Sequence, residues 1–136
     1  MARILCFDPG AHTGVAYWTG ENYLIDELDH TLVLPFLLGT HREKPLDAVV
    51  VEDYKTAGHL THDARLTLLL EGEIIGACKA LDIPCHTPDS QKMGPFVAEA
   101  RSILQLRKIK LNPPHKLDAL AHLLSFQWRM KHDEPL

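Results

Sequence analysis

The sequence predicts an α/β fold in which helices flank a mixed five-stranded β-sheet. Short apolar runs alternate along the chain with longer segments whose apolar residues recur at helical spacing. Two of the apolar runs end in an acidic residue, as expected of buried strands with a polar carboxyl end. With 46 % hydrophobic and 24 % charged residues, the 136-residue chain can build one packed core, so we expect a single domain spanning residues 1–136.

The first half of the chain is predicted to consist mainly of strands. A Pro-Gly turn follows the first apolar run, and Gly20-Glu21 has the composition of a hairpin turn. Thr31–Leu38 is apolar but contains Pro35, which favours a short irregular helix. The run Leu46–Glu52 follows this helix, which serves as a crossover connection, and is therefore expected to lie parallel to the first strand. The three strands before the crossover are expected to pair antiparallel in sequence order: Arg3–Asp8, Gly14–Thr19 and Asn22–Asp29.

The second half is predicted to consist mainly of helices. The clearest is Thr61–Leu81, in which Leu66, Leu70, Ile74 and Cys78 recur at helical spacing. The remaining elements are expected to be a short strand at Ile83–Thr87, a helix at Asp89–Lys110 that is interrupted at Gly94-Pro95, and a final helix at His115–Lys131 with Asn112 as its N-cap.

The net charge of −4 is unevenly distributed. Residues 1–100 carry 15 acidic and 7 basic side chains, whereas residues 101–136 carry 3 acidic and 7 basic ones. Every charged residue between Glu99 and Asp118 is basic. This segment is either an anion-binding face on an acidic protein or an ordinary solvated helix surface.

The three cysteines are too few for a disulfide scaffold or a structural zinc site, and indicate reduced, buried thiols in a cytoplasmic protein. No apolar run approaches the roughly 20 residues of a membrane span. Arg3 is followed closely by Asp8, a pattern unlike a signal peptide. We therefore expect no contact with membranes.

Four polar residues form the candidate active site. Asp8 and Glu52 end two strands that are predicted to be neighbours, and ligands bind at the carboxyl ends of such strands. His115 and Asp118 are three residues apart and share one face of the final helix. Carboxylates with one imidazole suit Mg²⁺ or Mn²⁺ better than zinc. Two such ions can support hydrolysis of a phosphodiester by in-line displacement.

Each member of this set also has a structural interpretation. Asp8 alone is compatible with a loop hydrogen-bond acceptor, and Asp53 could replace Glu52. His115 alone fits a residue at a helix start, and the joint pattern is more specific than its members.

Three segments, ILCFDPGAHTGVAYW, AVVVEDY and HKLDALAHLL, resemble the RuvC family of Holliday-junction resolvases within the RNase H-like nucleases. The resemblance implies an RNase H-like sheet and a metal-dependent endonuclease that nicks DNA four-way junctions in pairs, acting in recombination and repair as a homodimer. It places the metal-binding and catalytic residues at Asp8, Glu52, His115 and Asp118, with two Mg²⁺ per site, Mn²⁺ as a substitute and no organic cofactor. The short chain resembles compact phage members, which implies a bacterial cytoplasm or an infected host cell.

The resemblance also implies residues that contact DNA. Lys92 matches a lysine that assists at the scissile phosphate. Tyr54 is the nearest match to an aromatic wedge, but its offset differs by one residue and Lys55 takes the expected place. Phosphate contacts fit the basic segment as well: Arg101, Arg107, Lys108, Lys110 and Lys116.

The long helix carries the candidate dimer interface. Leu69, Gly72 and Gly76 lie where the family dimerises, and the two glycines allow another backbone to approach closely. Close packing of this helix on its own sheet explains the same glycines equally well. His122, four residues after Asp118, has no matching family role and is either a neighbour of the ligands or a structural residue.

Three other functions are compatible with parts of the pattern. The same carboxylate chemistry would serve an RNase H-like nuclease acting on a hybrid or another branched nucleic acid. A non-catalytic junction-binding protein would keep the fold, although a dense acidic cluster facing phosphates argues against it. Actin-like and sugar-kinase ATPases share an Asp-x-Gly…Thr phosphate loop, but they need two such domains and have no place for HKLDAL.

Overall fold

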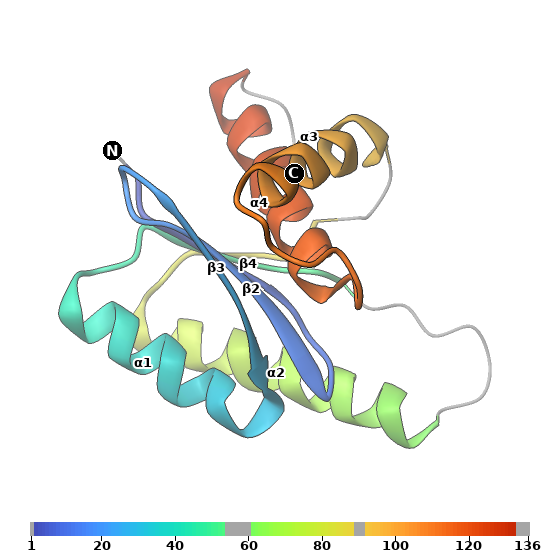
Figure 1. Cartoon of the computed structure of the whole chain (residues 1–136). Helices are drawn as coiled ribbons and strands as arrows, with labels where there is room; N and C mark the ends of the chain where they lie inside the picture. Colours follow the sequence, from blue (N-terminus) through green and yellow to red (C-terminus); the bar gives the residue numbers. More distant parts are fainter. Residues whose placement is uncertain (1, 54–60, 89–91, 133–136) are drawn as a thin grey trace.

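The computed structural model describes residues 2–53, 61–88 and 92–132. Its centre is a five-stranded mixed sheet in the order β3-β2-β1-β4-β5 (Figure 1). β1 pairs antiparallel with β2, which pairs antiparallel with β3, whereas β4 is parallel to both β1 and β5. The strands are β1 (Ile4–Asp8), β2 (His12–Trp18), β3 (Tyr23–Asp29), β4 (Ala48–Val51) and β5 (Cys85–His86).

Helices cover both faces of this sheet and create two hydrophobic cores. α1 (Val33–Glu43) and α2 (His62–Leu81) lie on one face, and α3 (Gly94–Leu106) and α4 (His115–Lys131) lie on the other (Figure 1). Leu5, Phe7, Val49 and Val51 point toward α1 and α2. The alternate residues point toward α3 and α4, because successive side chains of a strand face opposite sides of the sheet: Ile4, Cys6, Ala48 and Val50.

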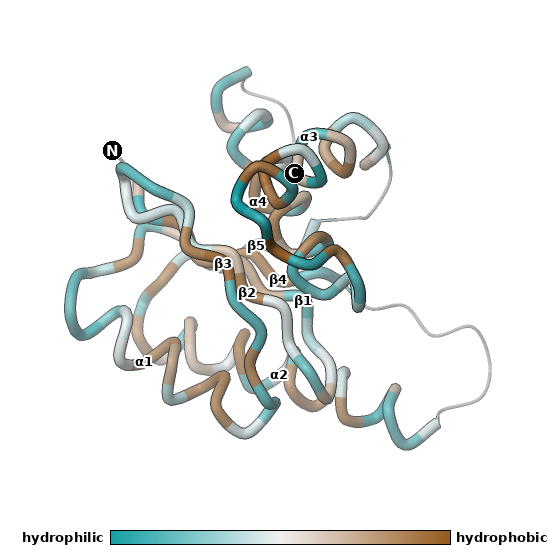
Figure 2. Tube along the Cα trace, in the orientation of Figure 1, coloured by the Kyte–Doolittle hydropathy of each residue, from teal (hydrophilic) through white to brown (hydrophobic). Residues whose placement is uncertain are grey.

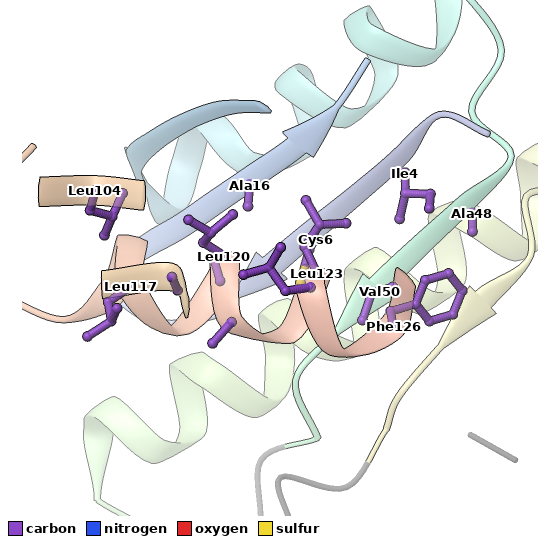
Figure 3. Close-up of a cluster of buried hydrophobic side chains, with 14 residues drawn as sticks. Ile4, Cys6, Ala16, Ala48, Val50, Leu104, Leu117, Leu120, Leu123 and Phe126 are labelled. Carbon is purple, nitrogen blue, oxygen red and sulfur yellow. The ribbon is translucent and has the colours of Figure 1, made fainter. Parts of the chain in front are cut away.

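α4 is the helix that matters most for the site, and its burial explains its position. An unbroken run from Ala119 to Phe126 is buried, which is more than one face of an amphipathic helix. Figure 3 shows Leu120, Leu123 and Phe126 of this helix among the buried side chains of β1, β2 and β4. Because the helix packs along the sheet by these side chains, its first turn is held at the carboxyl ends of β1 and β4.

Most of the expected elements are confirmed, including the order of the elements, the antiparallel pairing of the first three strands and the parallel placement of β4. The expected α2 also begins as predicted, because the side chain of Thr61 accepts a hydrogen bond from the backbone N–H of Ala64 at 3.1 Å. All three cysteines are free thiols; Cys6 and Cys78 are buried and Cys85 is half-buried.

Three local predictions were wrong. Pro35 does not shorten the first helix, because it is the third residue of an eleven-residue α1 that follows a 3₁₀ turn at His30–Leu32. Gly94 and Pro95 do not interrupt a helix but begin α3, where a proline lacks no hydrogen bond. Asn112 does not cap α4, since Pro114 is at the N-cap position.

None of the helices in the described residues is both long enough and apolar enough to cross a bilayer.

Candidate active site

An open cleft of about 490 Å³ lies at the carboxyl ends of β1 and β4. Its walls come from the ends of β1 and β4, the loop from β1 into β2, and the first turns of α2 and α4. All four residues of the predicted metal site line this cleft: Asp8, Glu52, His115 and Asp118. Segments more than one hundred residues apart in the sequence therefore meet at one cavity.

The pairing of β1 with β4 brings Asp8 and Glu52 together. Phe7 is the register partner of Val51, so the next residue of each strand lies at the same edge of the sheet. The backbone N–H of Glu52 donates to the carbonyl of Phe7 at 3.2 Å, which continues this pairing by one residue. The carboxyl groups of Asp8 and Glu52 are within hydrogen-bonding reach of each other.

The alternation of side chains explains why Glu52 is at the site. Glu52 has the same parity as Ala48 and Val50, which face α4, and it lines the cleft. Asp53 has the opposite parity and does not line the cleft. The sequence alone allowed either Glu52 or Asp53 as the acidic residue of the site. The alternation of side chains at the end of β4 places Glu52 there.

His115 and Asp118 enter the cleft from the first turn of α4. The Nδ1 atom of His115 is 3.8 Å from an Oδ2 atom of Asp8. The turn comes this close because Gly14 of β2 lies beneath it, and a Cβ atom there would be 1.9 Å from the carbonyl oxygen of His115. Gly14 thus seats the N-terminus of α4 directly on the sheet.

The electrostatics of the cleft are those of crowded carboxylates. Burial, the hydrogen bond with Glu52 and the charges of Glu52 and Asp118 together raise the pKa of Asp8 to about 9. Burial and the charge of Glu52 also raise the pKa of Asp118, against the opposing effect of His122 and His115. Part of the rise in both pKa values comes from repulsion between the negative carboxylates. A cation placed among these groups would offset that repulsion.

Two further polar side chains extend this cluster. The Nε2 atom of His115 is 3.8 Å from Oε1 of Glu27, a β3 residue that sequence reasoning missed. Its signal was the strand register, since Glu27 pairs with Gly14 and faces α4. The Nε2 atom of His122 is 3.5 Å from Oε1 of Glu52. The cleft walls also include Asp63 and Thr67 of α2, which the sequence did not single out.

The donor set suits a hard cation, although the described side chains are not gathered around one point. Three carboxylates and one imidazole are ligands that Mg²⁺ and Mn²⁺ accept. Among the described residues, no group of three or more His, Cys, Asp or Glu side chains converges as a ready-made metal cage. The cleft therefore supplies the chemistry of a divalent-metal site, and ligand side chains would have to close on the ion.

Those predicted DNA-contacting residues that the structure describes lie outside the cleft. Lys92, just before α3, is exposed and does not line it, and its backbone has a left-handed φ of 61°. Arg107 donates from its guanidinium to the carbonyl of Tyr23. Exposed side chains are those of Arg101, Arg107, Lys108 and Lys110, whereas Lys116 is half-buried. Tyr54 and Lys55 lie outside the described residues.

No protein-family model matches the chain, and no curated protein sequence is similar to it. Solved structures do match it. A structure of T. thermophilus RuvC in complex with Holliday junction substrate has a TM-score of 0.75 and 15 % identity, and the match covers 100 % of both chains. A further Thermus thermophilus RuvC structure has a TM-score of 0.74 and 17 % identity over 98 % of this chain and 99 % of that one. The chain has a RuvC-like fold. The RuvC-like fold confirms the predicted RNase H-like sheet with flanking helices.

Proposed function

We propose that this protein is a divalent-metal-dependent endonuclease that resolves four-way DNA junctions by paired nicks. The observation that carries the proposal is the meeting of Asp8, Glu52 and Asp118 in one open cleft of a RuvC-like fold. One of the similar structures is a RuvC complex with a Holliday junction substrate, which supports a junction as the substrate of this chain as well.

The residues proposed to hold the metal are Asp8, Glu52, His115 and Asp118. Mg²⁺ is the proposed ion, with two ions per site and Mn²⁺ as a substitute. Bound divalent ions supply Lewis acidity, which activates a water molecule and stabilises the leaving oxygen of a phosphodiester. Asp8 and Glu52 enter from the sheet and His115 and Asp118 from α4, so the sheet and one helix each offer two of the proposed ligands.

The residues proposed to bind the DNA backbone lie on α3 and in the segments directly before and after it. Arg101, Lys108 and Lys110 are exposed, and basic side chains bind phosphates without reading sequence. Lys92 is proposed to act at the scissile phosphate. Its exposed position before α3 leaves its ammonium group accessible to a DNA strand. Contacts by Tyr54 and Lys55 stay predictions from the sequence.

A homodimer is proposed to form through α2. Leu69 is 66 % exposed, and Cβ atoms at Gly72 and Gly76 would meet no atom of the described residues within 4 Å. Those glycines therefore do not serve the packing of α2 on its own sheet. Figure 2 shows hydrophobic segments along both α1 and α2, and Leu68 and Ile75 are further exposed apolar side chains of α2. A two-fold dimer would present two clefts to two opposed DNA strands.

Cleavage of a synthetic four-way junction tests the proposal. The junction is compared with a linear duplex, a flap and an RNA–DNA hybrid in Mg²⁺, Mn²⁺ or chelator. Paired symmetric nicks in the junction alone, lost with chelator, support the proposed function. Equal cutting of the flap or hybrid would instead indicate another RNase H-like nuclease. Junction binding without cutting in either metal would indicate a non-catalytic junction-binding protein.

A further inference from the structure

One buried polar residue of α4 is not explained by the core around it. His122 is only 4 % exposed, and its neighbours from Ala119 to Phe126 are buried and almost all apolar. An imidazole in such a position loses its hydration, so it needs a polar partner inside the protein. A leucine would satisfy the packing alone. The presence of histidine therefore indicates that this side chain makes a polar interaction.

The polar partner of His122 is a side chain of the candidate active site. The Nε2 atom of His122 lies 3.5 Å from Oε1 of Glu52. Glu52 itself lines the cleft, whereas His122 does not. The imidazole thus contacts a carboxylate of the cleft wall without being part of that wall itself.

The Glu52 side chain is long enough that a neighbouring group is needed to hold its carboxylate in one position. Its backbone is tied to β1 through the N–H donated to the carbonyl of Phe7. Its side chain, however, extends beyond the end of β4 with three rotatable bonds, and ordering a long side chain costs conformational entropy. A short, rigid imidazole that is itself buried in the core can hold this carboxylate in place beside the carboxyl group of Asp8.

We propose that His122 is a positioning residue that holds the Glu52 carboxylate toward Asp8 and the cleft. The inference rests on the proposed function, because it assumes that Glu52 binds a divalent ion there. His122 acts through Glu52 and does not touch the substrate. Partners of this kind orient ligands, and their loss lowers metal affinity by about 10–100-fold in other metal sites.

Three substitutions separate positioning from packing. His122→Leu fills the volume but removes the ring nitrogens. His122→Gln keeps an N–H donor at nearly the distance of Nε2, and His122→Asn carries the same amide on a side chain that is one carbon shorter. Ser125→Ala is the matched control, because Ser125 is on the same helix, equally buried at 4 % and outside the cleft walls.

The primary measurement is Mn²⁺ binding to the DNA-free protein by calorimetric titration, with folding checked by circular dichroism and Tm. We expect His122→Leu and His122→Asn to weaken Mn²⁺ binding by about 10–100-fold. His122→Gln is expected to keep the affinity within about threefold of wild type, and Ser125→Ala to leave it unchanged. If His122→Leu does not fold, the comparison of His122→Gln with His122→Asn carries the test.

The outcomes separate this inference from the proposed function. Wild-type protein that binds Mn²⁺ and cuts junctions, with His122→Leu or His122→Asn binding Mn²⁺ equally well, would overturn the positioning role alone. Equal losses in His122→Gln, His122→Asn and Ser125→Ala would also overturn it, because the effect would then follow packing. Wild-type protein that binds no Mn²⁺ would overturn both proposals.

Discussion

Gly14 of β2 and the carbonyl of His115 are so close that a Cβ atom at position 14 would lie 1.9 Å from that oxygen. The clash would be with backbone, which cannot move aside as a flexible side chain can. The absence of a side chain at one strand position thus determines how near the first turn of α4 comes to the strand end that carries Asp8.

Gly14→Ala is expected to lower the free energy of unfolding by about 1–3 kcal/mol or more, because α4 must shift from the sheet. It is also expected to abolish cleavage by displacing His115 and Asp118. Urea unfolding and junction cleavage measure the two effects. Gly39→Ala is the control, since a Cβ atom there meets nothing within 4 Å in the part of the chain that the structure describes, and alanine should stabilise α1 by about 0.5–1 kcal/mol. An equally stable, active Gly14→Ala protein would contradict the role of the close approach.

Asp8→Asn is expected to abolish cleavage and to leave junction binding largely intact. The carboxylate of Asp8 lies in the cleft, whereas the exposed basic residues lie outside it. Cleavage is measured in Mg²⁺ and binding by gel shift with chelator. Wild-type turnover in this variant would remove Asp8 from the active site.

The stability of metal-free protein is expected to fall as the pH rises from about 4 to about 9. The pKa of Asp8 is about 9 in the folded protein, against about 3.9 in an unfolded chain. The favourable contribution of Asp8 to the free energy of unfolding is therefore fully present below the pKa of the unfolded chain. It is lost as the pH rises through the pKa of the folded protein. The raised pKa of Asp118 acts in the same direction.

Melting temperatures in chelator between pH 5 and pH 9 check this prediction. Asp8→Asn should flatten the pH dependence and raise Tm at pH 8, because the variant buries no charge at position 8. A wild-type Tm that rises over this range by more than that of the variant would contradict the assigned direction.

The double variant Lys108→Ala, Lys110→Ala is expected to weaken junction binding and to flatten its salt dependence. Each lost phosphate contact lowers the log–log slope by roughly 0.9. The matched control is Arg42→Ala, Lys44→Ala, which removes the same charge at exposed positions at the end of α1. Equal slopes for both double variants would show that the two lysines contact no DNA.

Leu69→Glu is expected to convert the proposed dimer into folded monomers, because a charge would replace an apolar side chain at the centre of the α2 surface. Sedimentation measures the mass, and paired nicking should give way to single nicks. Leu106→Glu is the control, since Leu106 is 85 % exposed on α3, on the other face of the sheet. A wild-type protein that sediments as a monomer would contradict the dimer.

The sequence predicted the parts of this molecule that depend on repeating patterns. Apolar runs and helical spacing identified the pairing of the first four strands and α4, but not the place of β5, and the acids after two apolar runs identified Asp8 and Glu52. Glu27 could not be found this way, because its place beside His115 depends on the exact register between β2 and β3, which the sequence did not predict. The start of α3 was missed because Gly-Pro both breaks helices and begins them, and only tertiary packing decides between the two.

The parallel register of β1 and β4 has a consequence for how such a chain can diverge. The parity that sends Cys6 and Val50 into one core and Phe7 and Val51 into the other also sets the facing of Asp8 and Glu52. Deleting one residue within β4 would put Asp53 in the position of Glu52 and would also exchange the cores that the shifted β4 side chains enter. Substitutions that keep the apolar alternation can accumulate freely, whereas insertions and deletions in these two strands would be eliminated by misfolding before selection on catalysis could act.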